Sequence, residues 1–259
     1  MPAPLRIAFL GCGFITGVHS RALQSLRGVI ECGYASRDRA KADNCCRQYG
    51  GVQAYGDYAS AVDDPRIDAV VIAVPPRFHL DLTLQALGAG KHVLVEKPAF
   101  VRMADYHTVV AARNAAERVV LVGENDHYKP LAVCLRKLLK EDVIGEMVFA
   151  HFTTVAHRLK SADDWRNDET MAGGDAFFEE GIHWLHLAGS LGPTITSIQG
   201  FRPDVPRDGP DTRVKSMMVA FRYDNGAVGA LYYSREIPSL LRGLRLSKLL
   251  GRQGVIYIT

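Results

Sequence analysis

One feature near the N-terminus strongly limits the folds open to this chain. It is an apolar run followed by two closely spaced glycines and then by an amphipathic segment. Leu5–Leu10 is followed directly by Gly11-Cys12-Gly13, and the apolar residues of Ile15–Leu26 have the spacing of a helix. Gly11 allows a tight turn out of a strand, and Gly13 lets a pyrophosphate approach the backbone at the N-terminus of the next helix. This strand, turn and helix together predict a site for a dinucleotide.

The third glycine of this motif is replaced by Thr16, with Gly17 beside it. The alternative interpretation is an ordinary turn, because glycines end many strands. The context favours a dinucleotide, since the motif follows a strand and opens a helix. We expect the cofactor to contact both glycines of the turn and the residues that open the helix, Phe14 and Ile15.

Short apolar runs alternate with longer amphipathic segments through the rest of the first half. Such alternation is typical of βαβ units in a buried, doubly wound parallel sheet. We therefore predict an α/β, NAD(P)-binding Rossmann domain over residues 1–122. Its strands are expected at Arg6–Leu10, Ile30–Ala35, Ala69–Ala73, His92–Val95 and Val119–Val122, and its further helices at Arg39–Tyr49, Asp57–Val62, Phe78–Ala89 and Met103–Glu117.

The pattern changes near Gly123, where strand-like runs dominate. We predict an α+β domain with a mostly antiparallel open sheet over residues 123–259. Turn residues at Asp224-Asn225-Gly226 and at Gly251–Gly254 indicate two hairpins. Helices are expected at Pro130–Leu139 and Ala176–Leu191, and strands at Met147–Val155, Ile195–Gly200, Arg213–Tyr223, Ala227–Ser234, Leu244–Leu249 and Val255–Ile258.

Composition and charge exclude several classes of partner. The net charge of +3 is too small to indicate a nucleic-acid surface. The five cysteines are odd in number and have no C-x-x-C spacing, so neither a zinc site nor a disulfide framework is expected. The sequence has neither the pattern of a signal peptide nor a run long enough to span a membrane. We expect a cytoplasmic protein that binds neither nucleic acid nor membrane.

The end of the second predicted strand bears on the choice of cofactor. Asp or Glu usually accepts there from the adenosine ribose of NAD, but this chain has Ser36 followed by Arg37. Ser and Arg suit a 2′-phosphate, which a carboxylate would repel. The sequence therefore favours NADP over NAD. The alternative is that Asp38 binds the ribose and Arg37 stacks on adenine, which a kinetic preference for NAD would support.

Further motifs follow in a fixed order along the chain. They are Ala73-Val74-Pro75-Pro76-Arg77-Phe78-His79, Ala89-Gly90-Lys91-His92-Val93-Leu94-Val95-Glu96-Lys97-Pro98, Asp164-Trp165-Arg166, Gly173-Gly174 and Gly181-Ile182-His183. In this order they resemble the Gfo/Idh/MocA oxidoreductases over essentially the whole chain. The resemblance implies a Rossmann domain and then an α/β domain whose open sheet often mediates oligomerisation. It also implies oxidation or reduction of a carbinol on a sugar, cyclitol or related small molecule.

The resemblance implies roles for residues around the fifth strand. Lys97 matches the family's active-site lysine, the peptide before Pro98 is often cis in the family, and Glu96 matches a residue beside the nicotinamide ribose. Lys97 also follows the carboxyl end of a strand, where open sheets bind ligands and an ammonium can polarise an oxygen. The loop that lines the cofactor corresponds to Val74, Pro75 and His79.

A second group of expected site residues surrounds His183, which matches the family's proton-transferring histidine. Glu179 stands where the family most often has Asp, and its extra methylene leaves Glu180 as an alternative carboxylate. His186 follows three residues after His183, at a position where Asp is common, and such a pair suggests metal binding. No third ligand is apparent and the family reaction needs no metal, so none is expected.

Other residues are assigned on the same resemblance. We expect Asn125 to contact the cofactor, and His127 and Tyr128 to face the substrate. Trp165 and Arg166 belong to a segment that often frames the cleft, where Trp165 either stacks on a sugar or packs structurally.

The sequence thus predicts an NAD(P)-dependent oxidoreductase with Lys97, His183 and Glu179 as catalytic residues. The alternatives are a non-catalytic NAD(P)-binding sensor or partner subunit, and a glycoside hydrolase that uses transient oxidation. Family members continue beyond the strand in which this chain ends, so we expect a second domain without its final elements, as a fragment or a naturally short form. We also expect a homo-oligomer, dimer or tetramer, formed through the C-terminal sheet.

Overall fold

Side chains of the first strand, β1 (Leu5–Leu10), alternate between two apolar cores in the computed structural model. Ala8 and Leu10 lie in one core and Ile7 and Phe9 lie in the other, because successive side chains of a strand point to opposite faces. A strand that is apolar on both faces needs helices on both sides of its sheet. The first unit of the chain, Met1–Gly123, is built in this way.

The elements of the first unit follow the predicted alternation of strands and helices. The strands after β1 are β2 (Ile30–Ala35), β3 (Gln53–Tyr55), β4 (Ala69–Ile72), β5 (His92–Glu96) and β6 (Val120–Gly123). The helices are α1 (Phe14–Leu23), α2 (Arg39–Tyr49), α3 (Tyr58–Asp63), α4 (His79–Gly88) and α5 (Met103–Ala116), with short 3-10 turns η1 (Gln24–Leu26) and η2 (Pro76–Phe78).

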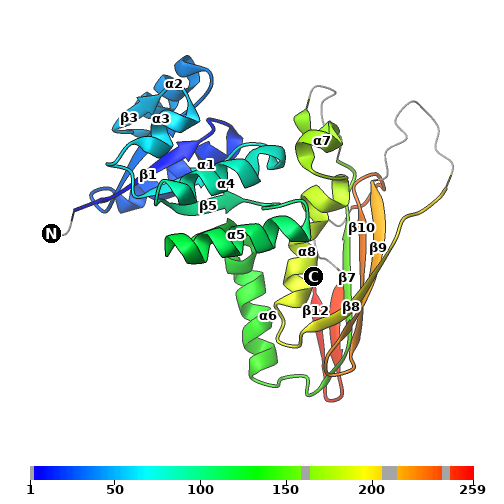
Figure 1. The fold of residues 1–259 in the computed structure, drawn as a ribbon. Helices are drawn as coiled ribbons and strands as arrows, with labels where there is room; N and C mark the ends of the chain where they lie inside the picture. Colours follow the sequence, from blue (N-terminus) through cyan, green and yellow to red (C-terminus); the bar gives the residue numbers. More distant parts are fainter. Residues whose placement is uncertain (1–2, 159–163, 206–214, 241–245) are drawn as a thin grey trace. The chain divides into compact units, whose positions relative to one another are not determined.

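The six strands are parallel and lie in the order β3-β2-β1-β4-β5-β6. Figure 1 labels β1, β3 and β5 of this sheet and the helices α1 to α5 that belong to the same unit. This order is that of a Rossmann sheet, which binds ligands beyond its carboxyl edge where the order reverses, here between β1 and β4. One face packs against α3, α4 and α5 through residues such as Val62, Leu87 and Val109. The other packs against α1 and α2, to which Leu23 and Ala42 belong.

The second unit, Glu124–Thr259, begins directly after β6. Its helical segments are η3 (Asn125–Tyr128), α6 (Pro130–Lys140), η4 (Trp165–Asn167), α7 (Glu169–Ala172), the π-helical turn η5 (Phe177–Gly181) and α8 (Ile182–Gly189). Its strands are β7 (Met147–Val155), β8 (Ile195–Phe201), β9 (Ser216–Tyr223), β10 (Val228–Ser234), β11 (Ser247–Gly251) and β12 (Val255–Ile258).

These six strands lie in the order β12-β11-β7-β10-β9-β8. Pairing is antiparallel except between β7 and β10, and both predicted hairpins, β9–β10 and β11–β12, are confirmed. Helices α6 and α8 cover one face of this sheet, where Leu135 and Leu187 pack with Phe152. Phe149 and Tyr232 are 51% and 46% exposed, and Tyr257 is 69% exposed.

The structure describes residues 3–158, 164–205, 215–240 and 246–259. The first residues of the strands predicted at 213–223 and 244–249 lie outside these ranges. The sequence did not predict β3, which has only three residues and is too short to stand out as an apolar run, or the short helix α7. The helix predicted at Ala176–Leu191 opens with a π turn. Within the described ranges, none of the helices has the length and apolarity that a membrane crossing requires.

Candidate functional site

The turn after β1 is held by a close approach that only glycine allows. Gly11 has φ +114°, and a Cβ atom there would lie 2.4 Å from the carbonyl oxygen of Ala73 at the end of β4. Its N–H donates to the carbonyl of Ala35 at the end of β2 (3.0 Å). Gly11 therefore lies against the ends of both strands that flank β1, at the point where the strand order reverses.

Gly13 differs from Gly11, because a Cβ at Gly13 would meet no atom within 4 Å. Gly13 is the N-cap of α1, so the open space lies at a helix N-terminus, where backbone N–H groups attract anions. The buried Thr16 hydroxyl donates to the carbonyl of Gly11 (2.8 Å), which braces the turn. Gly17 has the packing role of the missing third glycine, since its Cβ would lie 2.7 Å from the Tyr49 hydroxyl of α2. The turn thus fits a pyrophosphate.

Three residues at the end of β2 bear on the choice between NAD and NADP, and each makes a different contact. Asp38 caps α2, with its carboxylate accepting from the Ala40 N–H (3.0 Å). Ser36 is buried and its hydroxyl accepts from the Asp38 N–H (3.2 Å). The guanidinium of Arg37 lies over the Phe78 ring, 5.8 Å from its centre. Asp38 is therefore engaged in helix capping, whereas Arg37 lies beside the loop that follows β4.

That loop carries Val74 and Pro75, and the side chain of His79 lies behind it. His79 is fully buried at the start of α4. Its Nε2 lies 2.8 Å from the carbonyl of Val74, and its Nδ1 lies 3.0 Å from that of Pro98. Burial lowers the pKa of His79 despite these carbonyls. His79 ties the loop after β4 to the loop after β5.

The carboxyl end of β5 carries Glu96 and Lys97, and the predicted cis bond before Pro98 is confirmed. Glu96 is buried, and its Oε1 lies 2.7 Å from Nε2 of His19 on α1. Lys97 is partly buried, and its backbone N–H donates to Glu96 Oε2 (3.3 Å). His19 is a residue that the sequence did not reveal, because its partner lies 77 residues away.

In the second unit, His183 on α8 is held by Glu124, which follows β6. Nδ1 of His183 lies 2.7 Å and 2.8 Å from the two carboxylate oxygens of Glu124, and the side chains are 15% and 11% exposed. Burial alone would raise the pKa of Glu124, but the hydrogen bond and charge of His183 outweigh it and lower that pKa. Glu124 is a second residue that the sequence did not reveal.

Further polar groups surround this pair. Glu124, Asp126 and His183 each place a potential metal-ligand atom within 4.8 Å of the others, a grouping that the sequence did not reveal. Asp126 is, however, ion paired with the Lys129 ammonium (2.5 Å). His186 does not contact His183 in a ligand-like pair; its Nε2 instead lies 3.0 Å from Nδ1 of His127.

The acidic residues of η5 lie among arginines. Glu179 is 3.3 Å from Nε of Arg166 and 3.7 Å from Nη1 of Arg235. Glu180 is ion paired with Arg158 and accepts from the Tyr233 hydroxyl (3.0 Å). The Arg166 guanidinium also lies over the Trp165 ring, 4.6 Å from its centre.

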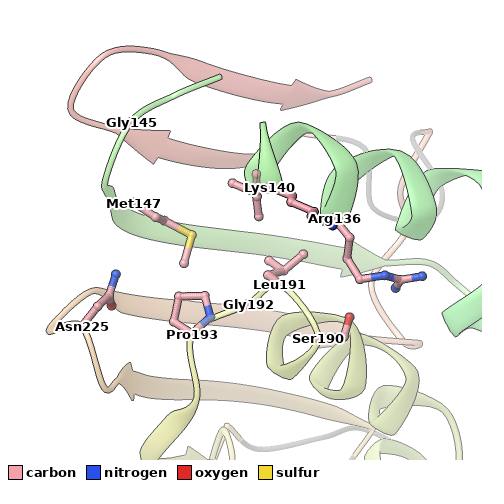
Figure 2. Close-up of a pocket in the computed structure, with 10 residues that line it drawn as sticks. Arg136, Lys140, Gly145, Met147, Ser190, Leu191, Gly192, Pro193 and Asn225 are labelled. Carbon is pink, nitrogen blue, oxygen red and sulfur yellow. The ribbon is translucent and has the colours of Figure 1, made fainter. Parts of the chain in front are cut away.

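A small cavity of about 220 Å³ opens beside His183. Its lining includes Trp184, Asp126 and Lys129, so it offers an apolar wall with charged groups at one side. Asn125 and Tyr128 are exposed on the neighbouring turn η3. A larger cavity of about 430 Å³ lies where α6, β7 and the end of α8 meet, and its labelled lining includes Arg136, Met147 and Pro193 (Figure 2). No predicted site residue lines that cavity.

Comparisons with known proteins match both units. Residues 5–124 match the family described as "Oxidoreductase family, NAD-binding Rossmann fold", and residues 133–249 match the GFO/IDH/MocA C-terminal domain. A dTDP-3,4-didehydro-2,6-dideoxy-alpha-D-glucose 3-reductase of Saccharopolyspora spinosa is 31% identical, over 90% of this chain and 69% of its own. An inositol 2-dehydrogenase of Streptomyces avermitilis is 27% identical, over 86% of this chain and 64% of its own.

A solved structure of an NAD-binding oxidoreductase from Klebsiella pneumoniae superposes with a TM-score of 0.85 at 26% identity. The match covers 99% of this chain and 73% of that one. The chain spans 64% of the length of the inositol dehydrogenase, less than two thirds of it.

Proposed function

Because the chain belongs to the GFO/IDH/MocA oxidoreductase family, we propose that it is a nicotinamide-dependent oxidoreductase acting on the carbinol or carbonyl carbon of a sugar, cyclitol or related small molecule. One relative is named for dehydrogenating inositol and another for reducing a dTDP-linked deoxy sugar, which supports this substrate class. The observation that carries the proposal is the Gly11–Gly13 turn, whose open helix N-terminus fits a pyrophosphate.

When bound, the dinucleotide supplies a nicotinamide carbon that accepts or gives the hydride. The chain supplies the remaining groups. The ammonium of Lys97 stabilises negative charge on the substrate oxygen, and His183 takes the hydroxyl proton during oxidation. Loss of one proton and one hydride turns the alcohol into a carbonyl, which balances the reaction. Glu96 is proposed to face the nicotinamide ribose, and Asn125 the cofactor.

The remaining predicted residues of the second unit receive the following roles in this proposal. The family position of Glu179 favours a catalytic carboxylate, but its two arginine neighbours favour a role in ordering the η5 turn. Glu180, Tyr128, Trp165 and Arg166 are proposed to contact the substrate. The Arg166 guanidinium lies over one face of the Trp165 ring, and the proposal places a sugar on the opposite face.

We propose NADP as the preferred cofactor, with NAD as the alternative. Ser36 and Arg37 follow the end of β2, where the ribose is usually bound in this fold, and the Asp38 carboxylate is engaged in capping α2. We also propose a cytoplasmic location.

We further propose that the chain forms a homo-oligomer through the second sheet. The exposed rings of Phe149, Tyr232 and Tyr257 support this proposal.

The test is turnover with a panel of sugars and cyclitols, each with NAD and NADP, followed by absorbance of the reduced nicotinamide. We expect turnover of at least one panel member and a lower KM for NADP. Lys97→Met should lower kcat by roughly 10²–10³-fold, as expected for loss of one charge-stabilising donor. The matched control is Lys137→Met, an exposed lysine on α6 that should leave kcat unchanged. Cofactor binding without turnover of any member would favour the sensor or partner-subunit alternative.

A further inference from the structure

Glu124 is positioned by the backbone before it meets His183. It follows β6 directly and caps η3, with its Oε1 accepting from the Asp126 N–H (3.0 Å). Both of its oxygens then face Nδ1 of His183 at 2.7 Å and 2.8 Å. Because a carboxylate can only accept, Nδ1 must carry the proton, and the lone pair of the neutral imidazole is on Nε2.

We propose that Glu124 is the positioning residue of His183, fixing its tautomer and stabilising the imidazolium that forms when Nε2 takes a proton. This inference rests on the proposed function of His183 as the proton acceptor. The arrangement follows the general pattern in which a buried carboxylate orients a catalytic histidine through Nδ1. The side chains of both residues are largely buried, so the contact acts in a low effective dielectric.

Glu179 is a weaker candidate for this role. It stands at the family's usual carboxylate position, but its oxygens lie 3.3 Å and 3.7 Å from two guanidiniums. Two nearby cations hold a carboxylate in place and reduce its ability to stabilise a third. The carboxylate that neutralises His183 therefore comes from the end of β6, 59 residues away in sequence.

A divalent metal is the rival interpretation of the same residues. Glu124, Asp126 and His183 have ligand-type atoms within 4.8 Å of one another. The Lys129 ammonium, 2.5 Å from the Asp126 carboxylate, already supplies a cation there and would repel another. Both oxygens of Glu124 are engaged by a ring N–H. The observed contacts therefore favour the hydrogen-bonded pair.

Other titratable groups face this pair and enter its pH dependence. On η3 they are Asp126 and His127, and on α8 the group is His186, whose charge also lowers the pKa of Glu124. Lys129 faces Asp126 from the start of α6, and Arg136 of α6 donates to the carbonyl of His127. The test must therefore follow His183 itself and not only the pH profile of the whole protein.

The experiment compares wild type with Glu124→Gln and Glu124→Asp in the full chain. The first readout is the tautomer of His183 from the ¹⁵N shifts of its ring nitrogens, with His183→Asn used to assign the signals. We expect Nδ1–H in wild type, a changed tautomer in Glu124→Gln, and Nδ1–H restored in Glu124→Asp. Thermal melting checks that each variant folds. Glu141→Gln, an exposed carboxylate on the same unit, is the matched control.

The second readout is the pH profile of kcat on the substrate found by the panel. Glu124→Gln should lower kcat by roughly 10²-fold or more with little change in KM, and should move the acidic limb to lower pH, because the imidazolium loses its carboxylate. An unchanged tautomer and limb in Glu124→Gln would overturn the proposal. The proposal would also be overturned if wild type bound one equivalent of Zn²⁺, with no other ligand present, and Glu124→Gln abolished that binding. The tautomer measurement needs no turnover. It therefore tests the role of Glu124 even if no substrate is turned over and the proposed function fails.

Discussion

Each unit of the molecule holds a histidine against a glutamate, and the two pairs differ in which partner the sequence reveals. In the first unit Glu96 belongs to a recognisable motif, whereas its partner His19 lies on α1 without one. In the second unit His183 belongs to the motif, whereas Glu124 does not. The two glutamates stand at the ends of the neighbouring strands β5 and β6. Motifs identify one member of each pair, and the fold supplies the other.

The largest expected difference separates the two histidines. His183→Asn should lower kcat by roughly 10²–10⁴-fold and leave the cofactor Kd unchanged, because it removes the proton acceptor. His19→Asn should instead weaken the cofactor by roughly tenfold, because Glu96 loses a charge-assisted partner. Steady-state kinetics and cofactor titration measure both. Equal effects on kcat from the two variants would remove the distinction between a chemical pair and a cofactor pair.

The two glycines of the first turn give the next contrast. Gly11→Ala should destabilise the protein by about 1–3 kcal/mol or more, because its φ is strained for alanine and its Cβ meets Ala73. Gly13→Ala should change stability by less than about 0.5 kcal/mol, because its Cβ meets open space. It should nevertheless weaken the cofactor, since the methyl occupies the pyrophosphate's approach. Melting temperature and cofactor titration separate the two outcomes, and equal losses of stability would contradict this account.

The smallest effect concerns pH and His79 of the first unit. Burial lowers the pKa of His79 in the folded protein. Below about pH 6.5 the histidine therefore binds a proton in the unfolded chain while it is still neutral in the folded one. The stability from neutral His79 is present above that pH and is lost as pH falls toward the folded pKa. His79→Gln should therefore flatten the fall in melting temperature on acidification, and the exposed His107→Gln should not. An unchanged slope in His79→Gln would show that His79 does not cause it.

Features that depend on residues close together in the sequence could be predicted. The β1 turn and the alternation of strands and helices follow from local spacing, and both are present in the structure. The position of Lys97 just after β5 is also as predicted, although its role was assigned through the family resemblance. His19 and Glu124 could not be predicted, because their partners lie 77 and 59 residues away. His79 illustrates the same limit, since its motif position says nothing about burial. The π turn at Phe177–Gly181 also depends on packing, with the Phe177 ring lying where a Gly181 Cβ would be.

We propose above that the chain passes a hydride between a nicotinamide and a substrate carbon. The most direct test uses a panel of sugars and cyclitols deuterated at their carbinol carbons, with oxidised NADP or NAD, and mass spectrometry of the recovered cofactor. The account predicts one deuterium in the reduced cofactor for at least one substrate, and none with His183→Asn over the same time. Tight binding of the cofactor with no deuterium transferred from any member of the panel would contradict it.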